Sequence, residues 1–195
     1  MNIHFEREVL LTGIGGQGVQ LAAKILALAG TLEGLEVLSL GTYGGTMRGG
    51  NTDATVVIAR EPIVTPPIVS RAWSALIVHP RYFEPVRAKL RADGLVVLDA
   101  DLLEGPLPDI PSEPLSINAT TLAREVDAPK SAALVLLGAF VSATGIVSHG
   151  AIEEALGASL PSYRQQTLEP NRRALGAGRD AVDSLSIPAW TTEAA

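Results

Sequence analysis

Three glycines, Gly13, Gly15 and Gly18, satisfy the pattern G-x-G-x-x-G between an apolar stretch at residues 8–12 and a stretch with helical periodicity at residues 19–30. When such glycines join a strand to a helix, the missing side chains let backbone N–H groups and the positive end of the helix dipole approach a phosphate. The spacing therefore predicts a turn that can bind an anionic ligand.

The sequence around this turn departs from two common nucleotide signatures. A P-loop requires Lys followed by Ser or Thr where Val19 and Gln20 stand. A dinucleotide site requires an acid near the end of the second strand, which we expect at residues 36–40, whereas Glu33 and Glu36 lie before this strand or at its start. Two interpretations stay open: an anion site of another kind, or glycines that serve only a tight turn and close helix packing.

A second glycine-rich loop, residues 42–51, places the Arg48 guanidinium among flexible glycines and beside Tyr43, Thr46 and Asn51. Arginine is suited to the capture of phosphate or carboxylate, and glycines allow a ligand to approach the backbone closely. An equally weighted alternative is that Arg48 pairs with an acid across a subunit interface while the glycines form a compact loop.

Signatures of catalysis and of metal binding are missing. The chain has no cysteine, so it cannot hold a disulfide, a thiolate zinc site or a cysteine-ligated iron–sulfur cluster. The histidines His4, His79 and His149 are scattered, and no G-x-S-x-G motif is present. Asp99 and Asp101 end an apolar stretch, where acids most often cap the next segment. We therefore expect no catalytic residue and no metal ligand on this chain.

Hydrophobic periodicity predicts an α/β fold, with a Rossmann-like, mostly parallel sheet, helices on both faces and a helical C-terminal part. We expect a single domain over residues 1–187 and a loose tail over residues 188–195. The expected strands lie at residues 8–12, 36–40, 53–59, 74–78, 95–99 and 115–117, and the expected helices at residues 19–30, 82–92, 120–126, 131–144, 148–156 and 164–182.

Composition narrows the classes of partner. Among 195 residues, 21 acidic side chains outnumber 15 Lys and Arg for a net charge of −6, which argues against nucleic-acid binding. The longest apolar run, residues 132–147, is interrupted by Ser142 and Thr144 and is short for a bilayer span, so we expect a buried helix and no membrane contact. The first residues do not form a secretory signal, so we expect cytoplasmic residence.

Three segments together resemble the gamma subunit of the 2-oxoacid:ferredoxin (acceptor) oxidoreductases, the family that acts on pyruvate, 2-oxoglutarate, 2-oxoisovalerate, indolepyruvate and phenylglyoxylate. They are LTGIGGQG at residues 11–18, YGGTMRGG at residues 43–50 and VVIAREPI at residues 56–63, in the same order and spacing as in the family. The resemblance continues at residues 95–99, 133–145 and 153–156.

The resemblance implies a subunit of a complex that converts a 2-oxoacid and coenzyme A to acyl-CoA and CO2. Thiamine diphosphate, Mg²⁺ and [4Fe–4S] clusters would belong to alpha, beta and ferredoxin-like delta subunits, with electrons passed to ferredoxin or a similar acceptor. This chain would be inactive alone and would help to form the coenzyme A side of the site and the subunit interface. The residues implied for coenzyme A binding are Gly13, Gly15, Gly16, Gln17, Gly18, Tyr43, Arg48, Gly49, Gly50 and Asn51.

One departure concerns residues 44–46, where this chain has Gly-Gly-Thr and many relatives have Gly-Pro-Glu. We therefore do not infer the substrate class of this chain from the resemblance. Two other functions remain as alternatives: a stand-alone Rossmann-like protein that binds a nucleotide or coenzyme A, and a purely structural assembly subunit.

Overall fold

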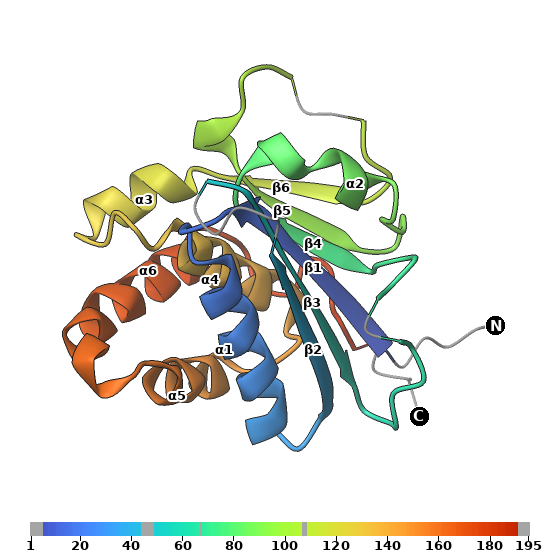
Figure 1. Cartoon of the computed structure of the whole chain (residues 1–195), viewed down its shortest axis with the longest axis horizontal. Helices are drawn as coiled ribbons and strands as arrows, with labels where there is room; N and C mark the ends of the chain where they lie inside the picture. The colour runs from blue at the N-terminus through green and yellow to red at the C-terminus, as the bar shows by residue number, and fades with distance from the viewer. Residues whose placement is uncertain (1–5, 44–48, 67, 107–108, 191–195) are drawn as a thin grey trace.

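The structure, a computed structural model, describes residues 6–43, 49–66, 68–106 and 109–190, with the side chain of Tyr43 outside the description. A six-stranded sheet with the order β2-β3-β1-β4-β5-β6 lies at its centre (Figure 1). Strands β1, β4, β5 and β6 are parallel to one another, and β3 is antiparallel to both of its neighbours, which confirms a mostly parallel sheet. The strands are β1 (Glu6–Ile14), β2 (Glu36–Tyr43), β3 (Asn51–Ala59), β4 (Ser74–Ile77), β5 (Leu95–Asp99) and β6 (Glu113–Ile117).

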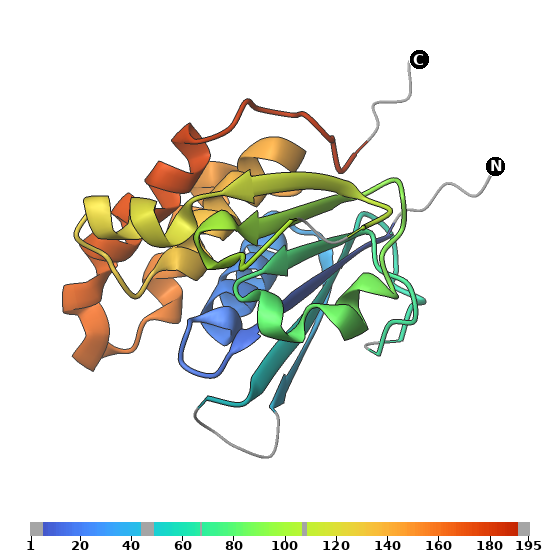
Figure 2. The same ribbon diagram turned by 90° about the horizontal axis from the view of Figure 1, so that it is seen from above.

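Helices cover the two faces of the sheet unequally. One face carries the larger apolar core and most of the helices, and the other carries a smaller core under α2 and the connector that follows β3 (Figures 1 and 2). The helices are α1 (Val19–Leu32), α2 (Glu84–Arg87), α3 (Ala119–Glu125), α4 (Ala132–Thr144), α5 (His149–Ser159) and α6 (Leu168–Asp180). None of the helices in the described ranges is long and apolar enough to cross a membrane.

The second glycine loop connects β2 to β3, where the sequence predicts no helix. These two strands follow one another along the chain and pair in antiparallel register, with Tyr43 opposite Thr52. Residues 44–50 are too few for a crossover helix, so the second glycine loop joins neighbouring antiparallel strands. β3 is therefore the antiparallel strand of a mostly parallel sheet.

The expected helix at residues 82–92 is also shorter than predicted. It consists of a 3-10 turn, η1 (Pro80–Tyr82), followed by the single turn of α2. Beyond α2 the backbone bonds to another segment: the Ala72 N–H donates to the Lys89 carbonyl, and the Arg91 N–H donates to the Ala72 carbonyl. Because these backbone groups pair across the fold, the segment cannot continue as a helix.

The C-terminal part is helical as predicted, with two differences. The expected helix at residues 164–182 is divided at Thr167 into a 3-10 helix, η3 (Ser162–Thr167), and α6. In addition, residues 188–190 of the expected tail pack against the fold, since Ala189 is fully buried and its N–H donates to the Thr144 carbonyl at 2.7 Å. Residues 185–190 thus lie against the end of α4. The rest of the expected tail, residues 191–195, lies outside the described residues.

Candidate anion-binding cleft at the glycine turn

The predicted glycine turn lies between β1 and α1, and the side chain of Gln17, a residue of the turn, stabilises it. The Ile14 N–H donates to Gln17 Oε1 at 2.9 Å, and the Gln17 N–H donates to the Ile14 carbonyl at 3.1 Å. Gly16 and Gly18 have φ values of 102° and 88°, a left-handed conformation that glycine adopts without strain. The Gln17 side chain therefore supports the turn from within.

Gly13 lies beneath this turn. A Cβ atom on Gly13 would lie 2.9 Å from Val19 Cγ2 and 3.1 Å from Val78 Cβ, so a side chain would push the turn away from β4. Gly13 and Gln17 thus shape the turn, whereas Gly15, Gly16 and Gly18 line the open cleft beside it.

The end of the second glycine loop lies directly beside the first. The Gly15 N–H donates to the Gly50 carbonyl at 2.9 Å, and Ile14 is opposite Asn51 in the β1–β3 ladder. Gly49, with φ 77°, provides the left-handed residue before this contact. The predicted binding residues Arg48 and the side chain of Tyr43 lie outside the described residues.

Asp53, which the sequence did not single out, connects the two loops. Its Oδ1 accepts a hydrogen bond from Thr12 Oγ1, and its Oδ2 accepts one from Asn51 Nδ2, both at 2.6 Å. Its backbone carbonyl also accepts from Gln20 Nε2 at 2.7 Å, in the first turn of α1. Asn51 Oδ1 is buried without a hydrogen-bond partner among the described residues.

A cleft of about 840 Å³ opens between the glycine turn and the C-terminal helices, within the size range of small-molecule sites. Gly15, Gly16 and Gly18 lie on one side. The opposite side comes from segments much later in the chain, namely Lys130 and Ser131 before α4, Tyr163, Arg164 and Thr167 on η3, and Asn171 on α6.

The electrostatics of the cleft favour an anion. Helices α1 and α4 both begin at it, and neither has a side-chain hydrogen bond that caps its first N–H groups. The two helix starts are close, since a Cβ atom on Gly18 would lie 3.5 Å from Ala133 Cβ. Unsatisfied N–H groups and the positive ends of two helix dipoles therefore converge on the cleft, beside the basic side chains of Lys130 and Arg164.

Asn171 supplies a further polar group at the cleft. Asn171 is 7% exposed and lines the cleft, and its Oδ1 accepts a hydrogen bond from Ser131 Oγ at 2.7 Å. The Ser131 hydroxyl thus donates to Asn171 and makes no side-chain cap of α4. The Asn171 Nδ2 group has no hydrogen-bond partner within the described part of the chain, so it is available to an acceptor atom in the cleft.

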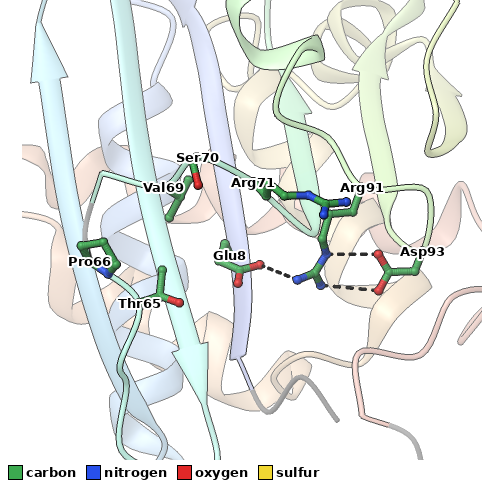
Figure 3. A pocket seen from close by; sticks show the side chains of 8 residues that line it. All are labelled: Glu8, Thr65, Pro66, Val69, Ser70, Arg71, Arg91 and Asp93. Carbon is green, nitrogen blue, oxygen red and sulfur yellow. Dashed lines mark hydrogen bonds and ion pairs between the residues drawn. The ribbon is translucent and has the colours of Figure 1, made fainter. Parts of the chain in front are cut away.

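A second cavity, of about 420 Å³, lies at the opposite end of the sheet (Figure 3). Arg91 contacts Glu8 at 3.3 Å and Asp93 at 3.1 Å, and Glu8 Oε2 also accepts from the Trp73 N–H at 3.2 Å. Burial, and secondarily the charge of Arg91, lowers the pKa of the neighbouring Arg7. Because these charges bond mainly to one another, we interpret the cluster as a support for the connector before β4.

A third cavity, of about 910 Å³, lies near the ends of β4 and β5 and includes Asp101. The Asp101 carboxylate accepts from the Thr121 N–H at 2.6 Å, and Asp99 Oδ1 accepts from the Ala119 N–H at 3.0 Å. Both acids thus bond to the start of α3, which confirms the capping role predicted for them. No cluster of three or more potential metal ligands occurs among the residues that the structure describes.

The sheet and the helices that cover it define a Rossmann-like α/β fold, and comparison with known proteins places the chain in a family. Residues 8–181 match the family described as "Pyruvate ferredoxin/flavodoxin oxidoreductase". The chain belongs to this family, as a gamma-type subunit of a 2-oxoacid:ferredoxin oxidoreductase.

Similar proteins span nearly the whole chain. The 2-oxoglutarate synthase subunit KorC of Methanocaldococcus jannaschii is 31% identical over 94% of this chain and 97% of its own. The pyruvate/ketoisovalerate oxidoreductases common subunit gamma of Pyrococcus furiosus is 32% identical over 92% and 97%. A crystal structure of the gamma subunit of a keto/oxoacid ferredoxin oxidoreductase from Geobacter sulfurreducens, 28% identical, matches with a TM-score of 0.76 over 90% of this chain and 97% of that one.

The fold also occurs within a longer chain. The 2-oxoglutarate:ferredoxin oxidoreductase of Magnetococcus marinus, solved with 2-oxoglutarate, coenzyme A and succinyl-CoA bound, matches with a TM-score of 0.79 at 19% identity. The match covers 91% of this chain and 32% of that chain. At this identity the similarity shows a shared fold.

Proposed function

We propose that the cleft at the glycine turn binds coenzyme A, within a complex that carries out the coenzyme A-dependent oxidative decarboxylation of a 2-oxoacid. The observation that carries the proposal is the convergence of two helix starts without side-chain caps and of the Asn171 Nδ2 group on one cleft of about 840 Å³. These are donors suited to the phosphate groups of coenzyme A. The coenzyme A named in the Magnetococcus marinus structure supports the same choice of ligand.

The residues of this chain would bind and orient the ligand. Gly16 and Gly18 let a phosphate approach the first N–H groups of α1, whereas the Gly15 N–H is bonded to the Gly50 carbonyl. Lys130 adds a positive charge just before α4. Coenzyme A supplies the thiol that takes up the acyl group. We retain the other predicted binding residues in this proposal: Gly13, Gln17, Tyr43, Arg48, Gly49, Gly50 and Asn51.

We assign the remaining chemistry to partner subunits in the cytoplasm. The chain lacks cysteine, so [4Fe–4S] clusters ligated by cysteine must lie on another chain. Thiamine diphosphate with Mg²⁺ would lie on the alpha and beta subunits, and a ferredoxin-like delta subunit would pass electrons to ferredoxin or a similar acceptor. The isolated chain would then be inactive. The Pyrococcus furiosus relative is named as common to two oxidoreductases, which supports a choice of 2-oxoacid by the other subunits.

The proposal is tested by replacing Lys130 in the assembled enzyme. The complex is purified anaerobically through a tag on this chain, checked for iron and thiamine diphosphate, and assayed by coenzyme A-dependent viologen reduction. We expect Lys130→Ala to raise the KM for coenzyme A about tenfold, because a charged contact to phosphate is lost, and to leave the KM for the 2-oxoacid unchanged.

Lys89→Ala is the matched control, since Lys89 follows α2 and does not line the cleft. An unchanged KM for coenzyme A in an intact Lys130→Ala complex would contradict the proposed role of this side chain. A solitary, colourless chain that binds NAD or FAD tightly would favour the stand-alone binding protein.

A further inference from the structure

The 3-10 helix η3 presents a flat, exposed side chain to the cleft. Tyr163 is 71% exposed, whereas Trp73, Phe83 and Phe140 are buried in the cores. The Arg164 guanidinium carbon lies 5.5 Å from the centre of the Tyr163 ring. Both residues line the cleft.

Local hydrogen bonds hold this pair in place. The Arg164 N–H donates to the Pro161 carbonyl at 2.8 Å, and Thr167 Oγ1 donates to the Arg164 carbonyl at 2.7 Å. Gln165 Nε2 donates to the Leu160 carbonyl at 3.1 Å, which ties η3 to the end of α5. The backbone under Tyr163 is therefore organised before any ligand binds, which lowers the entropic cost of stacking against the ring.

The cleft thus has two chemically different parts. An aromatic ring and a guanidinium offer flat surfaces on which a nucleobase stacks. The starts of α1 and α4, with Lys130 and the Asn171 amide, offer donors for anionic oxygens. A ligand that satisfies both parts is a planar base joined to phosphate groups.

We propose that Tyr163 and Arg164 form a stacking platform for the adenine base, with the phosphates directed to the starts of α1 and α4. This inference rests on the proposed function, because it divides the proposed coenzyme A site into a base subsite and a phosphate subsite. Tyr163 becomes a specificity-determining residue: its ring recognises the nucleotide half of the ligand and contributes nothing to the pantetheine half.

The test is calorimetric binding to the purified complex without turnover. The ligands are coenzyme A, adenosine 3′,5′-bisphosphate, uridine 5′-diphosphate and pantetheine. We expect Tyr163→Ala to weaken the binding of adenosine 3′,5′-bisphosphate about tenfold, as expected when a stacked base loses its aromatic partner, and to leave the binding of pantetheine unchanged. Tyr163→Phe keeps the ring and is expected to stay within about twofold of the wild type.

The matched control is Tyr82→Ala. Tyr82 also lies beside an arginine, with the Arg81 guanidinium carbon 5.8 Å from its ring centre, but it does not line the cleft. We expect this variant to bind all four ligands as the wild type does.

Several results would overturn the proposal. They are an unchanged affinity of Tyr163→Ala for the bisphosphate, an equal loss in Tyr163→Phe and Tyr163→Ala, or uridine 5′-diphosphate binding as tightly as the adenosine ligand. If the wild-type complex binds coenzyme A and Tyr163→Ala binds it equally well, the platform fails and the proposed function stands. If the wild-type complex binds neither coenzyme A nor the bisphosphate, both proposals fail.

Discussion

Asp53 bonds to three different elements around the glycine turn. Its two carboxylate oxygens accept from Thr12 on β1 and Asn51 at the start of β3, and its carbonyl accepts from Gln20 on α1. A carboxylate can accept both side-chain bonds at once, whereas a neutral amide would present one acceptor and one donor to the same two partners. The charge of Asp53 therefore fixes the relative position of the two glycine loops.

We expect Asp53→Ala to lower the free energy of unfolding by about 2 kcal/mol, because the substitution leaves Thr12 and Asn51 without their acceptor. Asp53→Asn is expected to lower the free energy of unfolding by less than Asp53→Ala does, since one acceptor oxygen remains. The measurement is urea unfolding of the full chain followed by circular dichroism. Asp183→Ala, at an exposed position near the C-terminus, is the control and is expected to change stability by less than about 0.5 kcal/mol. A stable Asp53→Ala variant would show that the network is dispensable.

For single residues, the sequence predicts local features and does not reveal hydrogen-bond partners that are far apart along the chain. The glycine pattern alone predicts an anion-accessible turn, because the residues involved are neighbours in the chain. Asp53 is separated from Thr12 by 41 positions, and Asn171 from Ser131 by 40. These bonds depend on β1–β3 pairing and on the packing of α6 against α4, which no local pattern encodes. A signal was nevertheless present before α4, where Lys130 and Ser131 precede the longest apolar run.

At the scale of elements, two glycines set how closely α4 and α6 approach. A Cβ atom on Gly138 would collide with the Leu175 carbonyl, and one on Gly178 would collide with the Val135 carbonyl. Both obstacles are backbone, so they cannot be relieved by a change of rotamer. This crossing matters for the cleft because Lys130 and Ser131 directly precede α4 and α6 carries Asn171.

We therefore expect Gly138→Ala and Gly178→Ala each to lower the free energy of unfolding by at least about 2 kcal/mol, through forced separation of the helices. Gly176→Ala is a control on the same helix, where an added Cβ atom would meet nothing within 4 Å. That variant is expected to be as stable as the wild type or more stable by up to about 1 kcal/mol, because alanine favours the helix. Thermal and urea unfolding measure the stability of the three variants. Equal destabilisation by all three substitutions would contradict the role assigned to the close approach of α4 and α6.

Most elements were predictable from periodicity, and the errors have physical causes. The apolar strands and the fully apolar α4 follow from their hydrophobic runs. The helix expected at residues 82–92 is too long, because Lys89 and Arg91 form backbone hydrogen bonds with Ala72. This tertiary contact overrides the local helix propensity. The antiparallel direction of β3 follows from the short connection at residues 44–50, because parallel neighbours need a crossover of a dozen or more residues.

At the scale of the whole molecule, the cleft is built from the two ends of the domain. The glycine turn comes from the first strand and helix, and the facing wall comes from residues 127–171. At the other end of α4, residues 185–190 pack against the helix terminus, where the Leu185 N–H donates to the Ser142 carbonyl at 2.9 Å. Trp190 Nε1 donates to the Ile146 carbonyl at 3.0 Å, and the Trp190 ring lies 4.9 Å from the Arg60 guanidinium carbon. Residues 185–190 therefore connect the end of α4 to the end of β3.

The measurement that tests the central claim most directly is a structure of the assembled oxidoreductase in complex with coenzyme A. We expect ligand density in the cleft, with phosphate oxygens within hydrogen-bond distance of the glycine turn and of Lys130 or Asn171. A cleft filled by partner side chains, with coenzyme A bound elsewhere, would contradict the account and would assign this chain to assembly alone.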